Sequence, residues 1–227
     1  MDPYTFSGEF RKAAVDYRYL LEGGYPEKPV LKLVGDRFRL SRIQRQVLYR
    51  GIDARERSAL RSEKRREPAI SDTSLYVDGY NVLFTIYNYL SGRQLFICDD
   101  GFLRDTGELR GRISNKPVFN TAVELLIEYA ARFDQLVFQV FLDEPVSHSG
   151  RLAADISKQM MEKNIPGEAV TVPTADTRLS DFDDDLIATS DSAIIDRHRG
   201  PVFDLARSIL DTAYQPNFPR LALLLDQ

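Results

Sequence analysis

Apolar residues near the N-terminus recur at the spacing of an amphipathic helix. Phe10, Ala14, Tyr17 and Leu21 stand at positions i, i+4, i+7 and i+11, which places them on one face of a 3.6-residue period. Ser7 precedes this stretch and has the side chain of a helix N-cap. The pattern predicts a helix over residues 7–21.

Two shorter helices are expected next. One begins after Pro29 and ends at Gly35, and the other follows Ser41 with Ile43 facing inward. The charged run over residues 61–67 is then expected to be a linker. Three short helices joined by tight turns resemble a helix-turn-helix or small helical-bundle unit.

The hydrophobic pattern changes at residue 74. Short, nearly continuous apolar runs now alternate with segments of helical period, which predicts a parallel sheet with helices on both faces. The expected strands cover residues 75–77, 136–142, 169–172 and 186–189. The expected helices cover residues 82–90, a segment capped by Asn120 or Thr121, residues 149–163 and residues 202–210.

Composition and charge add a division into two parts. Of the 227 residues, 43% are hydrophobic and 28% are charged, which is typical of a folded chain. The formal net charge is −4, but residues 1–68 hold 16 Lys and Arg against 10 Asp and Glu, a net of +6, and residues 69–227 have a net of −10. We therefore expect a basic helical domain over residues 1–68 and an acidic α/β domain over residues 69–227.

The arginines of the basic domain have two interpretations. Arginine binds phosphate oxygens bidentately, so these residues are candidate nucleic-acid contacts, with Arg42 and Arg45 as representatives. The alternative is an ordinary solvated helix face that pairs with nearby acids. The full set is Arg37, Arg39, Arg42, Arg45 and Arg50, extended by Arg61, Lys64, Arg65 and Arg66.

Other residue types exclude several classes of protein. Cys98 is the single cysteine, so an intramolecular disulfide is impossible and a reducing cytoplasm is the expected location. No apolar run approaches the ~18–20 residues of a membrane span, so no membrane partner is expected. The apolar segment 221–225 is expected to pack as a strand or helix, within the chain or against another copy in a homo-oligomer.

Aspartates follow the predicted strands. Asp78, Asp143 and Asp191 stand at or just past strand ends, and Asp176 follows the third strand. The carboxyl ends of parallel strands share one edge, where ligands bind, so we expect the four to converge. Carboxylates favour Mg²⁺ or Mn²⁺, which can polarise a phosphodiester and activate water.

Each aspartate also has a structural interpretation. Asp78 and Gly79 form an ordinary turn dipeptide, Asp143 can form a turn, and Asp191 is a good N-cap for the helix after it. Their occurrence after successive strands favours the metal site.

Three segments resemble NYN-type nucleases of the PIN-like superfamily. Residues 75–83 (LYVDGYNVL) resemble the D-G-Y-N-V-I pattern, residues 174–179 (TADTRL) the A-D-x-x-[LI] segment, and residues 188–191 (ATSD) the late A-T-S-D motif. The likeness covers roughly residues 74–200. The whole chain also resembles a prokaryotic family in which a basic N-terminal domain precedes such a core, and residues 141–150 (FLDEPVSHSG) are typical of that family.

The resemblance implies a PIN-like (Rossmann-like) α/β fold, preceded by a small all-α basic domain. It implies a metal-dependent endoribonuclease that hydrolyses RNA, structured RNA included, with Mg²⁺ or Mn²⁺ as cofactor. The implied metal ligands are Asp78, Asp176 and Asp191, with Asp143 at a strand end where the superfamily often places another acid. The implied substrate or water contacts are Asn81 and Ser190.

Further substrate contacts come from two other segments. Ser147 and Ser149 precede Gly150 at a predicted helix N-terminus, where they could hold a phosphate or serve as routine caps. Arg104 lies in the long segment 96–117, which is expected to line the cleft or form a lid.

Two rival functions remain. The family core often carries an acid on the helix after the first strand, and residues 82–90 have none, which favours a non-catalytic RNA-binding or RNA-processing adaptor. A haloacid-dehalogenase-like phosphatase needs a second Asp two residues after Asp78, but this chain has Tyr80 there.

Overall fold

The computed structural model describes residues 6–69, 73–107 and 113–225, and the chain divides into two compact units. Unit 1 comprises Met1–Glu63, Arg93–Glu108 and Asn217–Gln227, and unit 2 comprises Lys64–Gly92 and Leu109–Pro216. The division expected at residue 68 lies close to the first boundary. However, the segments 93–108 and 217–227 belong to the first unit, so the units are interleaved along the sequence.

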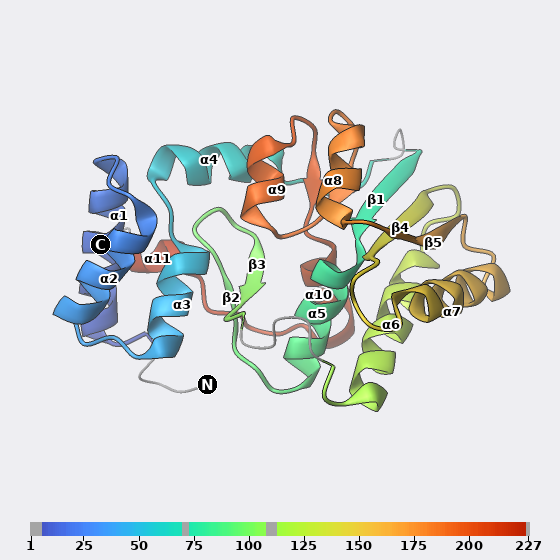
Figure 1. Ribbon diagram of the computed structural model, residues 1–227, viewed down its shortest axis with the longest axis horizontal. Helices are drawn as coiled ribbons and strands as arrows, with labels where there is room; N and C mark the ends of the chain where they lie inside the picture. Colours follow the sequence, from blue (N-terminus) through green and yellow to red (C-terminus); the bar gives the residue numbers. More distant parts are fainter. Residues whose placement is uncertain (1–5, 70–72, 108–112, 226–227) are drawn as a thin grey trace. The chain divides into compact units, whose positions relative to one another are not determined.

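Unit 2 is built on a five-stranded sheet of order β5-β4-β1-β6-β7, in which all neighbours are parallel (Figure 1). The central strand β1 pairs with β4 and β6; Asp78 lies beside Phe141, and Val77 lies beside Ala188. The predicted α/β class with a parallel sheet is confirmed. The strands are β1 (Ser74–Asp78), β4 (Val137–Asp143), β5 (Gly167–Val172), β6 (Ile187–Ala188) and β7 (Val202–Phe203).

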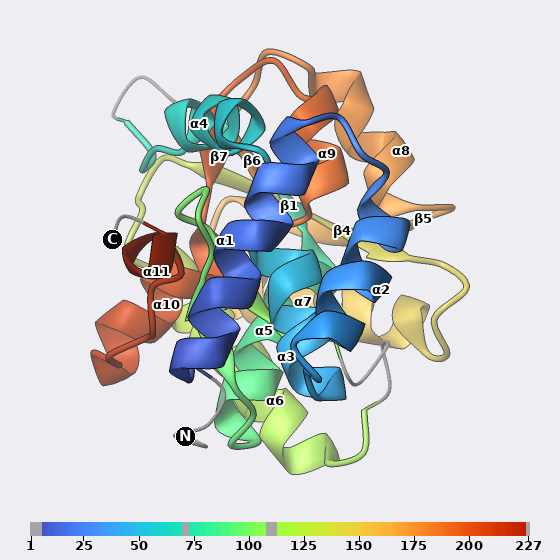
Figure 2. The same ribbon diagram turned by 90° about the vertical axis from the view of Figure 1, so that its left-hand side faces the viewer.

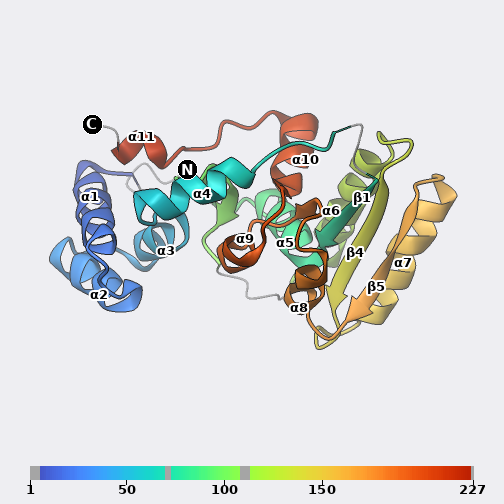
Figure 3. The same ribbon diagram turned by 90° about the horizontal axis from the view of Figure 1, so that it is seen from above.

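Helices lie against both faces of this sheet, as Figure 3 shows from above. Successive strand residues point to opposite faces, so Leu75 and Val77 face one layer and Tyr76 the other. The Tyr76 ring stacks on Phe182 with centroids 3.6 Å apart, and Phe141 lies on the same face. The helices of unit 2 are α5 (Gly79–Leu90), α6 (Lys116–Ala130), α7 (Ser149–Glu162), α8 (Ala175–Leu179), α9 (Ser192–Arg197) and α10 (Leu205–Tyr214).

Unit 1 is helical with one short antiparallel strand pair, and helices α1, α2 and α3 pack on one another (Figure 2). Ser7 caps α1 as predicted, and Ser41 forms a capping box with Gln44 at the start of α3. Its elements are α1 (Gly8–Glu22), α2 (Glu27–Arg37), α3 (Arg42–Gly51), α4 (Arg55–Lys64), β2 (Leu95–Ile97), β3 (Leu103–Asp105) and α11 (Ala222–Leu225).

The core of unit 1 draws on all three of its segments. Phe10, Tyr17 and Leu48 are fully buried together with Phe96 from the middle segment and Leu221 from the last. The apolar segment 221–225 therefore packs within its own chain, as a helix. The segment expected to form a lid, 96–117, instead contributes β2 and β3 to this unit, and its residues 108–112 lie outside the described part of the chain.

Several element boundaries differ from the sequence expectation. Helix α2 begins before Pro29, which is tolerated in a first turn, and continues past Gly35. A Cβ at Gly35 would lie 2.3 Å from Nη1 of Arg45, so a larger residue there would require the flexible Arg45 side chain to move. Ile43, expected to face inward, is 40% exposed.

Three further predictions were wrong. Residues 61–67 are not simply a linker, because α4 extends to Lys64. Helix α6 starts well before Asn120, with Asn115 as its N-cap. Residues 202–210 contain strand β7 before α10, which Asp204 caps.

None of the helices in residues 6–69, 73–107 and 113–225 is long and apolar enough to cross a membrane.

Candidate metal centre at the strand ends

The candidate site lies at the carboxyl ends of the strands of unit 2. From β1 the chain goes on to β4 on one side of it, whereas β6 lies on the other side, so the strand order reverses at β1. Such a switch point is where ligands bind in open parallel sheets. Asp143, Asp78 and Asp191 end or follow the adjacent strands β4, β1 and β6. The topology thus brings the ends of these three strands to one edge of the sheet, whereas the convergence of all four predicted aspartates stays a prediction.

Asp78 is the most buried of these acids, with 6% of the residue exposed. Its Oδ2 accepts a 2.9 Å hydrogen bond from the Thr189 hydroxyl, and its Oδ1 accepts one of 3.4 Å from the Asn81 N–H. Burial raises the pKa of the carboxyl to about 7, these two bonds oppose the rise, and the Asp191 and Asp143 carboxylates add to it. The surroundings of Asp78 thus disfavour the ionised form of its carboxyl group.

Asn81 and Ser190 bind each other. The Asn81 side-chain oxygen accepts hydrogen bonds from the Ser190 N–H at 2.9 Å and from the Ser190 hydroxyl at 3.1 Å. This pair ties the first turn of α5 to the turn after β6. Both residues therefore lie at the site, as predicted, with a contact that positions the backbone around Asp78.

Asp143 and Asp191 each accept hydrogen bonds from the start of a helix. Asp143 Oδ1 accepts the Ala175 N–H at 2.8 Å. Asp191 Oδ1 accepts the N–H groups of Ala193 at 2.8 Å and Ile194 at 3.4 Å, so it is the N-cap of α9. The structural interpretation of Asp191 as a cap is therefore also correct, and a cap can carry a second role.

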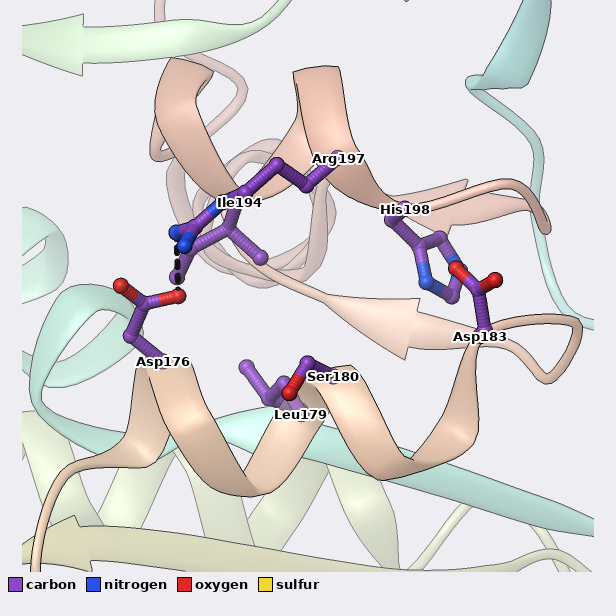
Figure 4. A pocket seen from close by; sticks show the side chains of 7 residues that line it. All are labelled: Asp176, Leu179, Ser180, Asp183, Ile194, Arg197 and His198. Carbon is purple, nitrogen blue, oxygen red and sulfur yellow. Dashed lines mark hydrogen bonds and ion pairs between the residues drawn. The ribbon is translucent and has the colours of Figure 1, made fainter.

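Asp176 has an arginine partner (Figure 4). Its Oδ1 lies 2.5 Å from Arg197 Nη2, and the pair borders a cavity of about 30 Å³, room for a water molecule. The bond to Asp176 raises the pKa of Arg197, and Asp191 adds to the rise through its charge. The structure thus groups Asp143 and Asp191 with Asp78, and it pairs Asp176 with a cationic side chain.

The donor atoms of these carboxylates suit a metal ion, but their present arrangement does not form a metal site. Asp78, Asp143 and Asp191 offer only hard oxygen donors, the kind that Mg²⁺ and Mn²⁺ prefer. Among the residues that the structure describes, however, no group of three or more His, Cys, Asp or Glu side chains is arranged to hold an ion.

Four other predicted contacts have different environments. Ser147 is exposed at the turn before α7, whereas Ser149 is buried and donates to the Glu144 carbonyl at 3.2 Å. Arg42 is exposed, whereas Arg45 donates to Asp36 at 2.9 Å and to a backbone carbonyl. Ser149 and Arg45 thus have internal partners, and their roles as substrate contacts stay predictions.

Arg104 is not a cleft residue. It is 4% exposed and donates to the fully buried Asp100 at 2.7 Å. Asp100 also lies 3.7 Å from the buried Arg61, which in turn donates to Asp53 at 2.9 Å. These charges form an internal network of unit 1, so part of the basic sequence counted above is neutralised inside the protein.

Sequence reasoning missed two features. Thr189 donates to Asp78 and accepts the Asp191 N–H at 3.1 Å, so one hydroxyl links two of the acids. Its place between Ala188 and Ser190 at a strand end was the available signal. The second feature is a hollow of about 920 Å³, called here the α6–α7 hollow, lined by residues of α5, α6, the turn after β4 and α7, Ser147 and His148 among them.

Two known families match this chain, one over each of the two parts into which its charge divides it. Residues 67–208 match a family described as a domain of unknown function, DUF5616. The chain belongs to the DUF5616 family. Residues 9–64 of this DUF5616 protein match a second family, described as a protein of unknown function, DUF434.

The DUF5616 chain also has a curated relative. The uncharacterized protein MJ0935 of Methanocaldococcus jannaschii is 30% identical over 185 residues, which cover 81% of this chain and 88% of the relative. No solved structure matches the chain. The DUF5616 match contains all five strands of the parallel sheet and the four predicted aspartates, so the candidate site lies wholly within the family region.

Proposed function

We propose that this DUF5616 protein is a Mg²⁺- or Mn²⁺-dependent endoribonuclease with a PIN-like core that hydrolyses RNA phosphodiester bonds. The observation that carries the proposal is the position of Asp143, Asp78 and Asp191 at the ends of three adjacent parallel strands, at the switch point of the sheet. The likeness of residues 75–83 and 188–191 to NYN-type nucleases supports it.

The metal would be held by Asp78, Asp143 and Asp191. When bound, it supplies a Lewis acid for the phosphodiester and lowers the pKa of a bound water. Asp176 joins the ligand set only if its ion pair with Arg197 opens. Because the Asp78 carboxyl is disfavoured as an anion by burial and by two neighbouring acids, a cation there offsets an unfavourable charge.

The residues around the acids supply the positioning. The Thr189 hydroxyl orients Asp78, and the Asn81–Ser190 pair holds the turn after β6 against α5. These contacts keep the acids of β1 and β6 in a fixed relation while the RNA backbone lies across the strand ends. Preorganisation of this kind is what phosphoryl-transfer sites require.

The decisive experiment is Mn²⁺-dependent cleavage of a labelled RNA by the full chain and by Asp78→Asn. We expect the variant to lose at least a hundredfold in rate while remaining folded, because a ligand and its charge are removed. Glu124→Gln is the matched control, since Glu124 is an exposed carboxylate on α6. Cleavage by Asp78→Asn at the wild-type rate would refute the site.

A second candidate is the non-catalytic RNA-binding or RNA-processing adaptor. It is favoured by the lack, among the described residues, of a ready group of metal-ligating side chains, and by the pairing of Asp176 with Arg197. Calorimetric titration with Mn²⁺ separates the two. If the protein is a nuclease, it should bind Mn²⁺, and Asp78→Asn should abolish this binding. If it is an adaptor, no Mn²⁺ binding should depend on Asp78.

A further inference from the structure

The α6–α7 hollow has the size of a ligand site and an aromatic floor. Its volume of about 920 Å³ lies in the range of ~300–1,000 Å³ typical of ligand pockets. Tyr80 and Phe119 line it with the small part of each residue that is exposed, 5% and 4%, and Phe84 packs against both rings, with centroids 5.6 and 5.8 Å away. Aromatic side chains of this kind are the usual platform for the bases of single-stranded nucleic acid.

The rim of the hollow carries cationic side chains. Lys116 stands in the first turn of α6, and Arg151 stands in the first turn of α7 after His148. Both Lys116 and Arg151 are exposed, and neither forms an ion pair with any residue in the described ranges of the chain. Asp155, one turn after Arg151, is the acid on the same rim.

The first turn of α7 adds a further attraction for anions. His148 adopts a left-handed conformation with φ of 67° and makes no side-chain hydrogen bond to cap the helix. The N-terminal amides of a helix and its dipole favour a phosphate at this end. The Ser149 N–H already donates to the Val146 carbonyl at 3.1 Å, so the remaining amides of this turn and the Arg151 side chain attract the same charge.

The wall opposite α7 is fixed before any ligand binds. The Tyr87 hydroxyl accepts hydrogen bonds from the N–H groups of Ser114 at 3.2 Å and Asn115 at 3.0 Å. Asn115 then caps α6 through its side-chain oxygen. The position of Lys116 therefore follows from a rigid contact between α5 and α6.

The hollow adjoins the strand ends through two short connections. Tyr80 follows Asp78 by two residues, and the turn that carries Ser147 leads directly from Asp143 at the end of β4. Burial raises the pKa of the Tyr80 phenol to about 12, and the nearby Asp143 carboxylate adds to the rise. Two of the residues that line the hollow thus lie within four positions of Asp78 or Asp143 along the chain.

We propose that the α6–α7 hollow binds nucleotides of single-stranded RNA next to the scissile bond, with a base over Tyr80 and Phe119 and the phosphates at Lys116 and Arg151. The identity of the polymer rests on the proposed function. The site itself rests on the pairing of an aromatic floor with a cationic rim, because an acidic peptide would use only the rim and an apolar ligand only the floor.

The test measures binding without cleavage. A fluorescein-labelled hexa-adenylate RNA is titrated with the full chain in EDTA at low salt, and anisotropy gives the dissociation constant. We expect Arg151→Gln and Lys116→Gln each to weaken binding about threefold to tenfold, because each removes a phosphate contact. Lys163→Gln is the matched control, since Lys163 is exposed at the far end of α7 and should leave the constant unchanged.

Two further measurements separate binding in the hollow from general charge attraction. Asp155→Asn should tighten binding at least twofold, because it removes a like charge, and a folding defect cannot produce this result. An abasic hexanucleotide of equal charge should bind at least fivefold more weakly than hexa-adenylate if bases stack on the floor. An acidic peptide that competes as well as RNA would overturn the assignment.

The outcomes distinguish this inference from the proposed function. Wild-type affinity in Arg151→Gln and Lys116→Gln, or equal binding of the abasic probe, overturns the hollow as a nucleotide site even when Mn²⁺-dependent cleavage is intact. Conversely, the expected binding pattern without any cleavage upholds the hollow and refutes the nuclease. No binding of hexa-adenylate by the wild-type chain refutes the hollow outright.

Discussion

At Asp78, burial and hydrogen bonding act in opposite directions on one carboxyl group. The Thr189 hydroxyl and the Asn81 N–H stabilise the anion, while burial and two neighbouring carboxylates destabilise it more, so the pKa rises to about 7. A buried carboxyl group whose pKa is shifted in this way is a candidate for a functional role.

The pH dependence of stability follows from this shift. The folded-state pKa exceeds the ordinary value of 3.8, so the folded protein binds more protons between the two values, and the free energy of unfolding falls as the pH rises from about 4 to about 7. Asp78→Asn cannot ionise. The free energy of unfolding of Asp78→Asn, taken relative to that of the wild type, should therefore increase by on the order of 2 kcal/mol as the pH rises from 5 to 8.

Urea unfolding in EDTA at the two pH values measures this difference. Glu124→Gln should follow the wild-type pH dependence, because Glu124 is exposed on α6. Identical pH dependence in Asp78→Asn and the wild type would mean that Asp78 is not a destabilised acid.

The residues of the site were predictable to different degrees. Asp78, Asp143 and Asp191 could be placed at one edge from the sequence, because strand ends in a parallel sheet coincide. The partner of Asp176 could not, because Arg197 lies 21 positions away on a helix whose orientation depends on packing. The internal use of Arg104 was equally hidden, since a charged side chain gives no sign in sequence that it is buried.

At the scale of elements, Lys64 fixes the C-terminal end of α9. Its Nζ donates to the carbonyls of Ile195 at 2.7 Å and His198 at 2.6 Å, which belong to the end of the helix that Asp191 caps at its start. A cation at a helix C-terminus satisfies terminal carbonyls and complements the dipole. Lys64 was expected to extend a phosphate-binding face, and the structure corrects this.

Lys64→Met should therefore lower the free energy of unfolding by roughly 1–2 kcal/mol, because two charged hydrogen bonds are lost. Hydrogen exchange should accelerate at the amides of α9 more than elsewhere in unit 2. Lys158→Met is the control, since Lys158 forms only an exposed ion pair within α7. Equal effects of the two substitutions would contradict this role.

Gly79 joins β1 to α5 by a close approach to β4. A Cβ there would lie 2.7 Å from Cδ2 of Leu142 and 2.8 Å from the Phe141 carbonyl oxygen. Gly79→Ala should cost about 1–3 kcal/mol in urea unfolding, because the backbone must move.

Gly150→Ala is the comparison for Gly79→Ala. Gly150 lies in a first helical turn, and a Cβ there meets nothing within 4 Å, so that protein should be as stable as the wild type or slightly more stable. A neutral Gly79→Ala would show that the junction is not close-packed.

The elements were predictable where their patterns were long. Helices α1 and α7 and strand β4 span many residues and appear close to their expected bounds. Strand β7 has two residues, too few for a period, so residues 202–210 were expected to be one helix. Strand β7 pairs with β6, and a contact between segments so far apart along the chain cannot be read from the local sequence.

At the scale of the whole molecule, the last segment of the chain completes unit 1. Leu221 is fully buried, and its N–H donates to the Ile97 carbonyl at 2.9 Å. Leu221→Ala should destabilise unit 1 by about 2–4 kcal/mol in denaturant unfolding. Leu223→Ala, at a position 63% exposed, should have little effect, and a similar cost at both positions would contradict the packing of this segment.

The change of charge along the chain predicted a division close to the first boundary of unit 1, but it did not predict the composition of unit 1. The segments 93–108 and 217–227 join residues 1–63 by contacts between residues far apart in sequence. A net charge counted along the chain cannot register such contacts. It also counted Arg61, which is buried beside aspartates, as available to a polyanion.

The three-segment core of unit 1 has a consequence for the synthesis of the protein. Domains commonly fold from the N-terminal end as the chain leaves the ribosome. Here residues 1–63 emerge before Phe96 and Leu221, which complete their core. Residues 1–63 must therefore wait for the segments that carry Phe96 and Leu221 before they acquire their final packing.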